Sequence, residues 1–273
     1  MSEYLVDIKD ERLSFFTPAG EVKALGGVSI HLKEGEVLGI VGESGSGKSS
    51  LMKCLFFDEE ATEGDVRARP FDGGAANLLQ LSPQHQRAIR NTVFGMVYQN
   101  PYLGLRMDFS SLSNIAEQMI AAGNRNVGAM RVRGEELLAR VNIPLSREAE
   151  PPRNFSGGMQ QRVQIAKALS NNPPILLLDE PNSALDFENT GLLFRRVREL
   201  VETGERTALI VLHDPALALR WCRRLLLLDG GRLVDDVATE GMGAEALQAV
   251  LRQLYPTIQV RRDEGGRFYC LPD

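Results

Sequence analysis

An apolar run that ends in a glycine-rich loop constrains the fold of this chain more than any other feature. Residues 37–41 read VLGIV, and residues 42–49, which follow directly, read GESGSGKS. An apolar run bounded by turn signals is typical of a buried parallel strand. The loop matches the phosphate-binding P-loop pattern. A chance Gly/Ser turn is the alternative, but the helical segment that begins at Ser50 favours the P-loop.

The chemistry expected of this loop is the binding of nucleotide phosphates. Its glycines let backbone N–H groups curl around an anion, and the following helix points its positive N-terminus at the phosphates. Lys48 is expected to reach the β and γ phosphates, and the Ser49 hydroxyl to coordinate Mg²⁺. The predicted cofactors are therefore ATP and Mg²⁺. The loop residues predicted to bind them are Gly42, Ser44, Gly45, Ser46, Gly47, Lys48, Ser49 and Ser50.

Strand and helix signals alternate along the rest of the chain, which indicates a mainly parallel sheet. Residues 4–41 show strands with turns at Thr17-Pro18-Ala19-Gly20 and Lys33-Glu34-Gly35, whereas residues 64–98 look irregular until an apolar strand candidate at 93–98. Helical spacing dominates from about residue 101 to residue 152. Further strands are expected at 175–178, 208–212 and 225–228.

We therefore expect an α/β fold with a mainly parallel core sheet, an N-terminal antiparallel β subdomain and an inserted helical subdomain. The predicted divisions are 1–98 for the β subdomain and P-loop core, 99–155 for the helical insertion, 156–238 for the rest of the core, and 239–273 for a C-terminal extension. In the extension an amphipathic helix, 244–254, precedes two strand candidates at 257–262 and 267–271. Such a helix and hairpin would serve either as a structural cap on the core or as a docking element for a partner.

Composition narrows the possible partners. The net charge of −5 argues against nucleic-acid binding, which usually needs a basic field. No apolar run approaches the ~20 residues that span a bilayer, and the first residues lack the charged and apolar regions of a signal peptide. A cytoplasmic protein is therefore expected, peripheral to the inner membrane if it serves an importer. Cys54, Cys222 and Cys270 show no paired spacing and are expected to be free thiols.

Two further motifs carry chemistry. Residues 175–180, ILLLDE, form an apolar run that ends in two acids. Asp179 is placed to hold Mg²⁺ and Glu180 to polarise the water that attacks the γ-phosphate. Residues 155–162, FSGGMQQR, put Ser156, Gly157 and Gly158 just before a helical run. They offer a second anion site of hydroxyl, bare N–H groups and helix dipole, although an ordinary N-cap is the alternative for Ser-Gly-Gly alone.

Taken in order, these motifs resemble those of an ABC ATPase over roughly residues 4 to 235. The P-loop, Gln99, FSGGMQQ at 155–161, Asp179-Glu180, SALD at 183–186 and His213 occur in the family's order and spacing. Asn182 stands where the family usually has Thr, and Phe155 where Leu is common. Both are small departures, and hydrolysis is expected to survive them.

The resemblance assigns roles to the remaining site residues. It implies that Gln99 links the Mg²⁺ site to the helical subdomain and that His213 is a switch near the γ-phosphate. Ser156, Gly157 and Gly158 would contact ATP bound to the opposite subunit, and Asp186 would lie on a loop that crosses the dimer interface. An aromatic residue usually stacks on adenine, and Phe16 is preferred here over Phe15. Either could instead be strand core.

Two subclasses of the family fit the sequence. Residues 100–106, 114–119, 123–125 and 155–162 look like the ATP-binding subunit of the bacterial carbon–phosphorus lyase system for phosphonates. Residues 17–25 are similar to the ATPases of oligopeptide, dipeptide or nickel importers, and the tail departs from both groups. The lyase resemblance is preferred. The implied partners are a second ABC ATPase subunit, identical or closely homologous, and either a soluble lyase core or a membrane permease.

Overall fold

The computed structural model describes residues 3–18, 20–203 and 206–272, which fall into two compact units. The first unit consists of the residues up to Leu81 and those from Val201 onward, and the second spans Ser82–Leu200. Parallel strands, an antiparallel sheet and packed helices are all present, so the predicted α/β fold is confirmed.

An antiparallel sheet forms the N-terminal part of the first unit. Its strands are β1 (Val6–Thr17), β2 (Gly20–Leu32) and β4 (Glu63–Ala68), in the order β2-β1-β4. β1 and β2 form one long hairpin, because the turn predicted at residues 17–20 joins Thr17 to Gly20. Ala19 of that turn lies outside the described residues.

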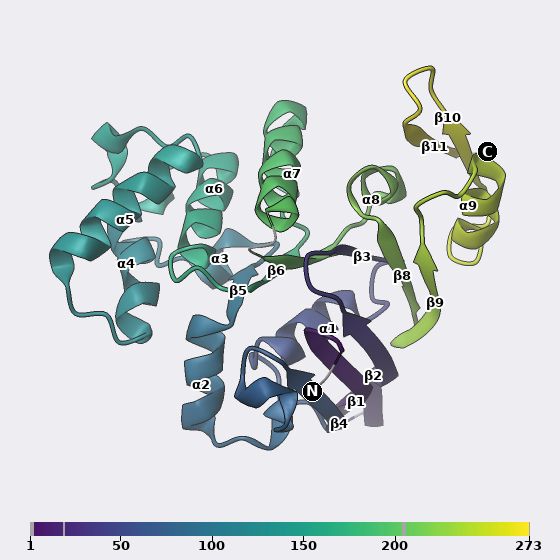
Figure 1. Ribbon diagram of the computed structural model, residues 1–273, viewed down its shortest axis with the longest axis horizontal. Coiled ribbons are helices and arrows are strands. Elements are labelled where there is room, and N and C mark those ends of the chain that lie inside the picture. The colour runs from purple at the N-terminus through teal and green to yellow at the C-terminus, as the bar shows by residue number, and fades with distance from the viewer. Residues whose placement is uncertain (1–2, 19, 204–205, 273) are drawn as a thin grey trace. The chain divides into compact units, whose positions relative to one another are not determined.

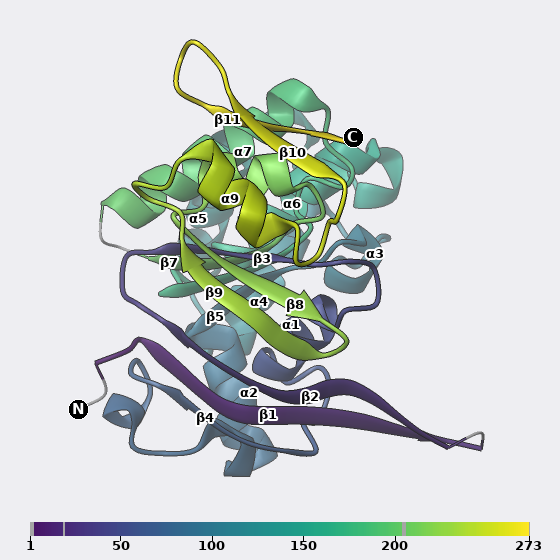
Figure 2. The same ribbon diagram turned by 90° about the vertical axis from the view of Figure 1, so that its right-hand side faces the viewer.

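Parallel strands form the core of the first unit. β3 (Val37–Val41) lies between β7 (Thr207–Val211) and β8 (Arg224–Asp229) and runs parallel to both, while β9 (Arg232–Ala238) pairs antiparallel with β8. Every residue of β3 and β7 is buried, as expected of strands covered on both faces. Figure 2 shows β8 and β9 side by side above the long β1–β2 ribbon.

The helices of the first unit follow its strands. α1 (Lys48–Leu55) follows β3, α8 (Pro215–Trp221) follows β7, and α9 (Ala244–Leu251) follows β9. The predicted terminal hairpin is present as β10 (Ile258–Arg262) and β11 (Phe268–Pro272), which pair antiparallel. Figure 1 shows this hairpin and α9 together at the C-terminal end of the chain.

The second unit is mainly helical. Its strands β5 (Phe94–Val97) and β6 (Ile175–Asp179) are parallel and fully buried. Figure 1 shows α4, α5 and α6 gathered into one bundle, and the bundle encloses a core that includes Ile115, Leu137 and Val163. The helices are α2 (Pro83–Thr92), α3 (Pro101–Gly104), α4 (Ser111–Ala121), α5 (Val127–Arg140), α6 (Gly157–Ala168) and α7 (Phe187–Glu202). Short 3₁₀ turns lie at Asp72–Gly74 and Leu78–Gln80 in the first unit, and at Leu145–Arg147 and Pro152–Asn154 in the second.

The strand expected at 93–98 is present as β5, but the expectation of irregular structure before it was wrong. This stretch contains β4 and the ten-residue helix α2. α2 buries only Ile89 and Asn91, so it shows no apolar period that sequence analysis could detect. Pro83 at the first helical turn was the available start signal.

Cys54 and Cys222 are buried, Cys270 is partly buried, and all three are free thiols. Across the described ranges, no helix is both long enough and apolar enough to cross a membrane.

Candidate nucleotide-binding site

The predicted site residues fall into two groups according to compact unit. The P-loop and His213 belong to the first unit, whereas Gln99, Ser156, Asp179, Glu180 and Asp186 belong to the second. Each group has its own internal geometry.

The P-loop is a folded cradle closed by its own lysine. Lys48 is 4% exposed, and its Nζ donates to the carbonyl oxygens of Gly42 at 2.8 Å and Glu43 at 2.7 Å. A third contact, at 3.2 Å, joins Nζ to the Ser46 hydroxyl. The ammonium is therefore held at the centre of the loop, where it can meet the phosphates of a nucleotide.

Two glycines are required by close approach and backbone conformation. A Cβ at Gly42 would lie 2.1 Å from the carbonyl oxygen of Leu228. Gly47, the N-cap of α1, has a φ of 99°, and a Cβ there would lie 2.7 Å from the carbonyl oxygen of Ala24. Larger residues at these positions would push the loop off the strands beneath it.

His213 lies at the same sheet edge as the P-loop. The register pairs Ile40 with Val211, and the Leu212 N–H donates to the Ile40 carbonyl at 3.0 Å. Gly42 and His213 thus follow the carboxyl ends of two neighbouring parallel strands, which is where open α/β sheets bind ligands. His213 is exposed there.

In the second unit the structure brings Gln99 and Glu180 together. β5 and β6 are in register, with Val97 beside Leu178, so both residues emerge at one edge. Gln99 Nε2 donates to Glu180 Oε2 at 2.6 Å. Asp179 is 4% exposed and Glu180 8% exposed. A buried carboxylate that is oriented by an amide is suited to act as a general base and accept a proton from water.

The segment after Glu180 folds back onto Gln99 and onto the start of α6. Ser183 Oγ donates to the Gln99 carbonyl at 3.1 Å. The Ser156 hydroxyl caps α6 by accepting the Met159 N–H at 3.3 Å, and a Cβ at Gly158 would lie 3.1 Å from the Ala184 carbonyl oxygen. Ser156 and Gly157 remain exposed at this helix start.

Asp186 is held just before α7. Its Oδ1 accepts the Asn189 N–H at 2.8 Å. This backbone hydrogen bond, together with the Asn189 side chain, lowers the pKa of Asp186 despite some desolvation. The carboxylate therefore stays charged at the helix N-terminus.

Gln99 has a polar support beneath it that the sequence did not predict. Gln161 and Gln164 on α6 are buried, and each donates its Nε2 to the Tyr98 carbonyl, at 3.3 and 3.4 Å. Gln164 also accepts the Tyr98 N–H. The sequence shows glutamines at 160, 161 and 164, but their pattern does not indicate which strand they contact.

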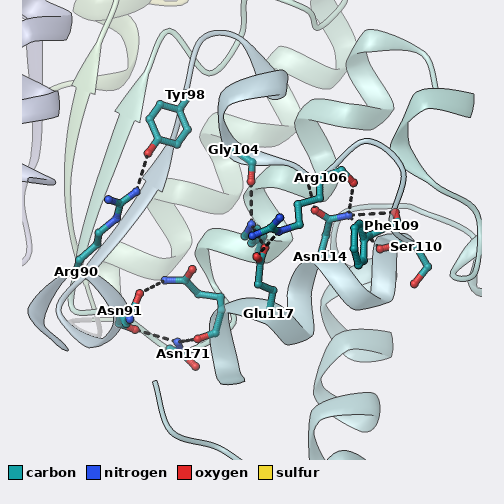
Figure 3. A network of polar contacts seen from close by, with 12 residues as sticks. Arg90, Asn91, Tyr98, Gly104, Arg106, Phe109, Ser110, Asn114, Glu117 and Asn171 are labelled. Atoms are coloured by element: carbon teal, nitrogen blue, oxygen red, sulfur yellow. Dashed lines mark hydrogen bonds and ion pairs between the residues drawn. The ribbon is translucent and has the colours of Figure 1, made fainter. Parts of the chain in front are cut away.

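A second polar network holds the loop that follows Gln99 (Figure 3). Asn114 accepts the Arg106 N–H at 2.8 Å and donates to the carbonyls of Arg106, Phe109 and Ser110. Glu117 accepts from Arg106 and, at 2.8 Å, from Lys167, which also donates to the Gly104 carbonyl. Burial opposes the charged form of Glu117, but the hydrogen bonds from Lys167 and Arg106 outweigh burial and lower its pKa.

The two N-terminal phenylalanines point to opposite faces of β1. Phe15 shares a face with Leu13, because the irregularity after Leu13 adds a residue to β2 and leaves β1 in alternation. Leu13 pairs with Leu25, whose Cδ2 lies 3.1 Å from a Cβ built on Gly47 of the P-loop. The P-loop side is therefore the side of Phe15, whereas Phe16, the predicted adenine contact, faces the other way and is 79% exposed.

The residues present fit a Mg²⁺ that arrives with its nucleotide. Within the described part of the chain, no three His, Cys, Asp or Glu side chains form a metal cluster. Mg²⁺ at nucleotide sites uses one or two carboxylates together with phosphate oxygens and water. The Asp179 carboxylate and the Ser49 hydroxyl each supply an oxygen donor of this kind.

Comparison with known proteins assigns the family. The ABC transporter family matches residues 25–183, which include the P-loop, Gln99, the Ser156 segment and Asp179-Glu180. The chain belongs to the ABC transporter family. It is an ABC-type ATPase, an ATP hydrolase.

Relatives of this cassette are named for several substrates. It is 37% identical over 218 residues to PhnK of Escherichia coli, named as a phosphonates utilization ATP-binding protein, covering 80% of this chain and 84% of PhnK. It is 38% identical over 230 residues to the lipoprotein-releasing system protein LolD of Maricaulis maris, covering 84% and 96%. A peptide ABC transporter ATP-binding protein of Sinorhizobium fredii is 31% identical over 275 residues, covering 100% and 81%.

A solved structure supports the fold. The ATP-binding cassette MJ0796, solved as a dimer in a post-hydrolysis state with ADP and Pi, aligns with a TM-score of 0.79. It is 30% identical, and the alignment covers 87% of this chain and 100% of MJ0796. The shared fold is thus that of a nucleotide-binding ABC cassette.

Proposed function

We propose that this cassette binds Mg-ATP at the P-loop and hydrolyses it as half of a head-to-tail pair. Lys48, already centred in its cradle, would meet the β and γ phosphates. Ser49 and Asp179 would hold Mg²⁺, which neutralises phosphate charge when it is bound. Gly42, Ser44, Gly45, Ser46, Gly47 and Ser50 would complete the phosphate site with the backbone and hydroxyl groups of the loop and of the first turn of α1.

Glu180 is the proposed general base. Its carboxylate is buried and accepts a hydrogen bond from the Gln99 amide at 2.6 Å, which orients the group that would accept a proton from water. Gln99 is hydrogen-bonded to Glu180 and would lie near Mg²⁺. It would therefore couple the presence of the γ-phosphate to the conformation of the loop that follows it. His213 would supply a polar contact from the edge where the P-loop lies.

The opposite half of the nucleotide contact is proposed to come from a second subunit. Ser156 and Gly157 are exposed at the start of α6. MJ0796 was solved as a dimer with ADP and Pi. In this proposal Ser156, Gly157 and Gly158 face the partner's nucleotide and Asp186 lies at the interface, so Ser156→Arg abolishes ATP-dependent dimers without abolishing ATP binding.

The proposed partner is the enzyme core of a carbon–phosphorus lyase. The observation that carries this proposal is the network of Figure 3, which joins the stretches whose sequences resemble the lyase ATPase. Residues 100–106 and 114–119 are linked through Arg106, which pairs with Glu117 and donates its N–H to Asn114. Tyr102 and Leu103 are each 64% exposed on the short helix α3, within residues 100–106. Exposed apolar side chains that are held by such a network are suited to dock a partner.

Affinity purification from phosphonate-grown cells, without detergent, tests the partner. The full-length wild-type chain is expected to recover phosphonate-metabolising subunits, and Tyr102→Ala with Leu103→Ala to lose them while ATPase activity remains. Val132→Ala is the matched control, because Val132 is 68% exposed on α5 outside residues 100–106. In the same cells Glu180→Gln is expected to abolish growth on phosphonate as sole phosphorus source.

The alternative partner is the permease of an oligopeptide, dipeptide or nickel importer. It is favoured by the similarity of residues 17–25 to that group and by the Sinorhizobium fredii relative. Recovery only with membranes, together with normal growth of Glu180→Gln on phosphonate, would select the importer. The same surface, residues 99–120, would then receive a cytoplasmic helix of the permease near Gln99.

A further inference from the structure

The C-terminal extension, residues 239–273, packs against α8 and β9 of the first unit. β11 packs against α8, the helix that begins two residues after His213, and β10 packs against α9. Gln253 Nε2 donates to Asp235 Oδ2 on β9 at 2.7 Å, and Gln248 Oε1 accepts the Val260 N–H at 2.9 Å. The extension is therefore a fixed part of the unit that carries the P-loop and His213.

Tyr255, between α9 and β10, has a buried polar atom that the fold does not satisfy. Its hydroxyl oxygen is buried and has no hydrogen-bond partner among the described residues. Burial raises the pKa of Tyr255, the nearby Gly42 N–H lowers it, and Glu43, Asp214 and Cys270 raise it further. The Gly42 N–H approaches the hydroxyl without completing a hydrogen bond. The hydroxyl is thus near the start of the P-loop, and the charge of Asp214, the residue after His213, acts on it.

An orphaned buried hydroxyl is costly, and phenylalanine would fill the same space without that cost. The hydroxyl can accept one hydrogen bond and donate another. Asp214 can receive it, because the carboxylate uses Oδ1 for the Ala216 N–H at 2.8 Å and keeps further acceptor positions. Hydrogen bonds that are loose in a ligand-free site often tighten only when the ligand is bound.

We propose that Tyr255 is a positioning residue for ATP hydrolysis that joins the P-loop to the switch segment. When nucleotide draws the P-loop into place, its hydroxyl accepts the Gly42 N–H and donates to the Asp214 carboxylate. Asp214 caps α8 and follows His213 directly, so this bridge fixes where the His213 side chain stands relative to the γ-phosphate. The extension thereby makes the switch depend on the P-loop. This inference concerns only the ATPase and is independent of the partner.

The test compares Tyr255→Phe with Tyr269→Phe in the full-length chain. Tyr255→Phe removes only the hydroxyl and is expected to lower kcat about fivefold, the loss of roughly one hydrogen bond. The KM for ATP and the ATP Kd by calorimetry are expected to stay within about twofold, since Lys48 and the loop remain. The melting temperature is expected to hold or rise, because an unsatisfied hydroxyl is gone. Tyr269→Phe makes the same change at a 40% exposed position of β11 and leaves all four values unchanged.

A double-mutant cycle with Asp214→Asn examines the bridge itself. Asn keeps an acceptor for the Ala216 N–H, so the cap survives. If the hydroxyl acts through Asp214, the combined variant loses no more kcat than the stronger single variant. A Tyr255→Phe enzyme with wild-type kcat overturns the proposal. So do additive losses in the cycle, or a kcat loss matched by a lower melting temperature and weaker ATP binding.

Discussion

The P-loop and the Gln99–Glu180 pair are built in different ways. In the P-loop, Lys48 is held by carbonyls only five and six residues earlier in the chain. Glu180 is instead held by Gln99, 81 residues away, and Gln99 is held by Ser183 and, through Tyr98, by glutamines on α6. A local cradle binds whether or not distant segments move, whereas a long-range pair can respond to them. We therefore expect that different mutations can impair ATP binding and ATP hydrolysis separately.

The largest effect is expected at Glu180. Glu180→Gln keeps the shape of the pair and loses the basic oxygen, so kcat is expected to fall roughly 10²–10⁴-fold. ATP affinity is expected to change little, because the P-loop is intact. Phosphate release and calorimetry measure the two quantities. In the presence of Mg-ATP this variant is expected to accumulate as a dimer by gel filtration, and retention of near wild-type turnover would contradict the assigned role.

The first unit also carries a buried carboxyl whose effect should appear in stability. Glu11 on β1 is 0% exposed, and burial raises its pKa to about 8 from 4.5. The folded state then holds a proton that the unfolded state releases, so stability present at low pH is lost as pH rises from about 4.5 to about 8.

Glu11→Gln is expected to remove this pH dependence. The difference in unfolding free energy between wild type and variant should change by on the order of a few kcal/mol between pH 5 and pH 9, in favour of the variant at high pH. Denaturant titrations at several pH values measure it. Glu21→Gln, at an exposed position of β2, is the control and should leave the slope as in the wild type. If the unfolding free energies of Glu11→Gln and wild type change in parallel with pH, Glu11 does not hold a buried proton in the folded state.

Lys48→Ala is expected to weaken ATP binding by the P-loop. It removes the ammonium at the centre of the cradle and is expected to weaken ATP binding by roughly 10- to 100-fold, the loss of one or two charge-assisted hydrogen bonds. Calorimetry with ATP measures the change, and circular dichroism checks that the fold is kept. Equal ATP affinity in variant and wild type would show that the loop does not use this lysine.

Gln99→Ala is expected to slow ATP hydrolysis without weakening ATP binding, and its effect should be smaller than that of Lys48→Ala. Removing the amide frees the Glu180 carboxylate to reorient, so kcat is expected to fall about tenfold while ATP affinity is kept within about twofold. Gln118→Ala makes the same change within the second unit away from Glu180 and should alter neither quantity. If Gln99→Ala weakens ATP binding as much as it slows hydrolysis, the two regions are not separable.

The smallest expected effect concerns adenine. Because Phe15 lies on the P-loop side of β1, Phe15→Ala is expected to weaken ATP binding several-fold, as the loss of one aromatic stack does. Phe16→Ala should change it less. Comparing ATP with inorganic triphosphate isolates the adenine contribution, since triphosphate affinity should be equal in both variants. The opposite ranking would restore Phe16 as the adenine contact.

Several features could be predicted from the sequence because they depend on neighbours along the chain. The apolar run 37–41, the Gly-Lys-Ser spacing of the P-loop, the acids that end β6 and the C-terminal hairpin each follow from local pattern. Helix α2 could not be predicted, because a helix with one buried aliphatic side chain has no apolar period.

What the sequence determined by itself is the order of the motifs, and with it the family and the chemistry of each short segment. Only the tertiary structure decided which segments meet: Gln99 with Glu180, Gln164 with Tyr98, and Arg106 with Glu117. Strand register and helix packing make these contacts across long stretches of chain. Residue patterns encode local conformation and which faces are buried, but the pairing of distant polar groups depends on the summed packing of the core.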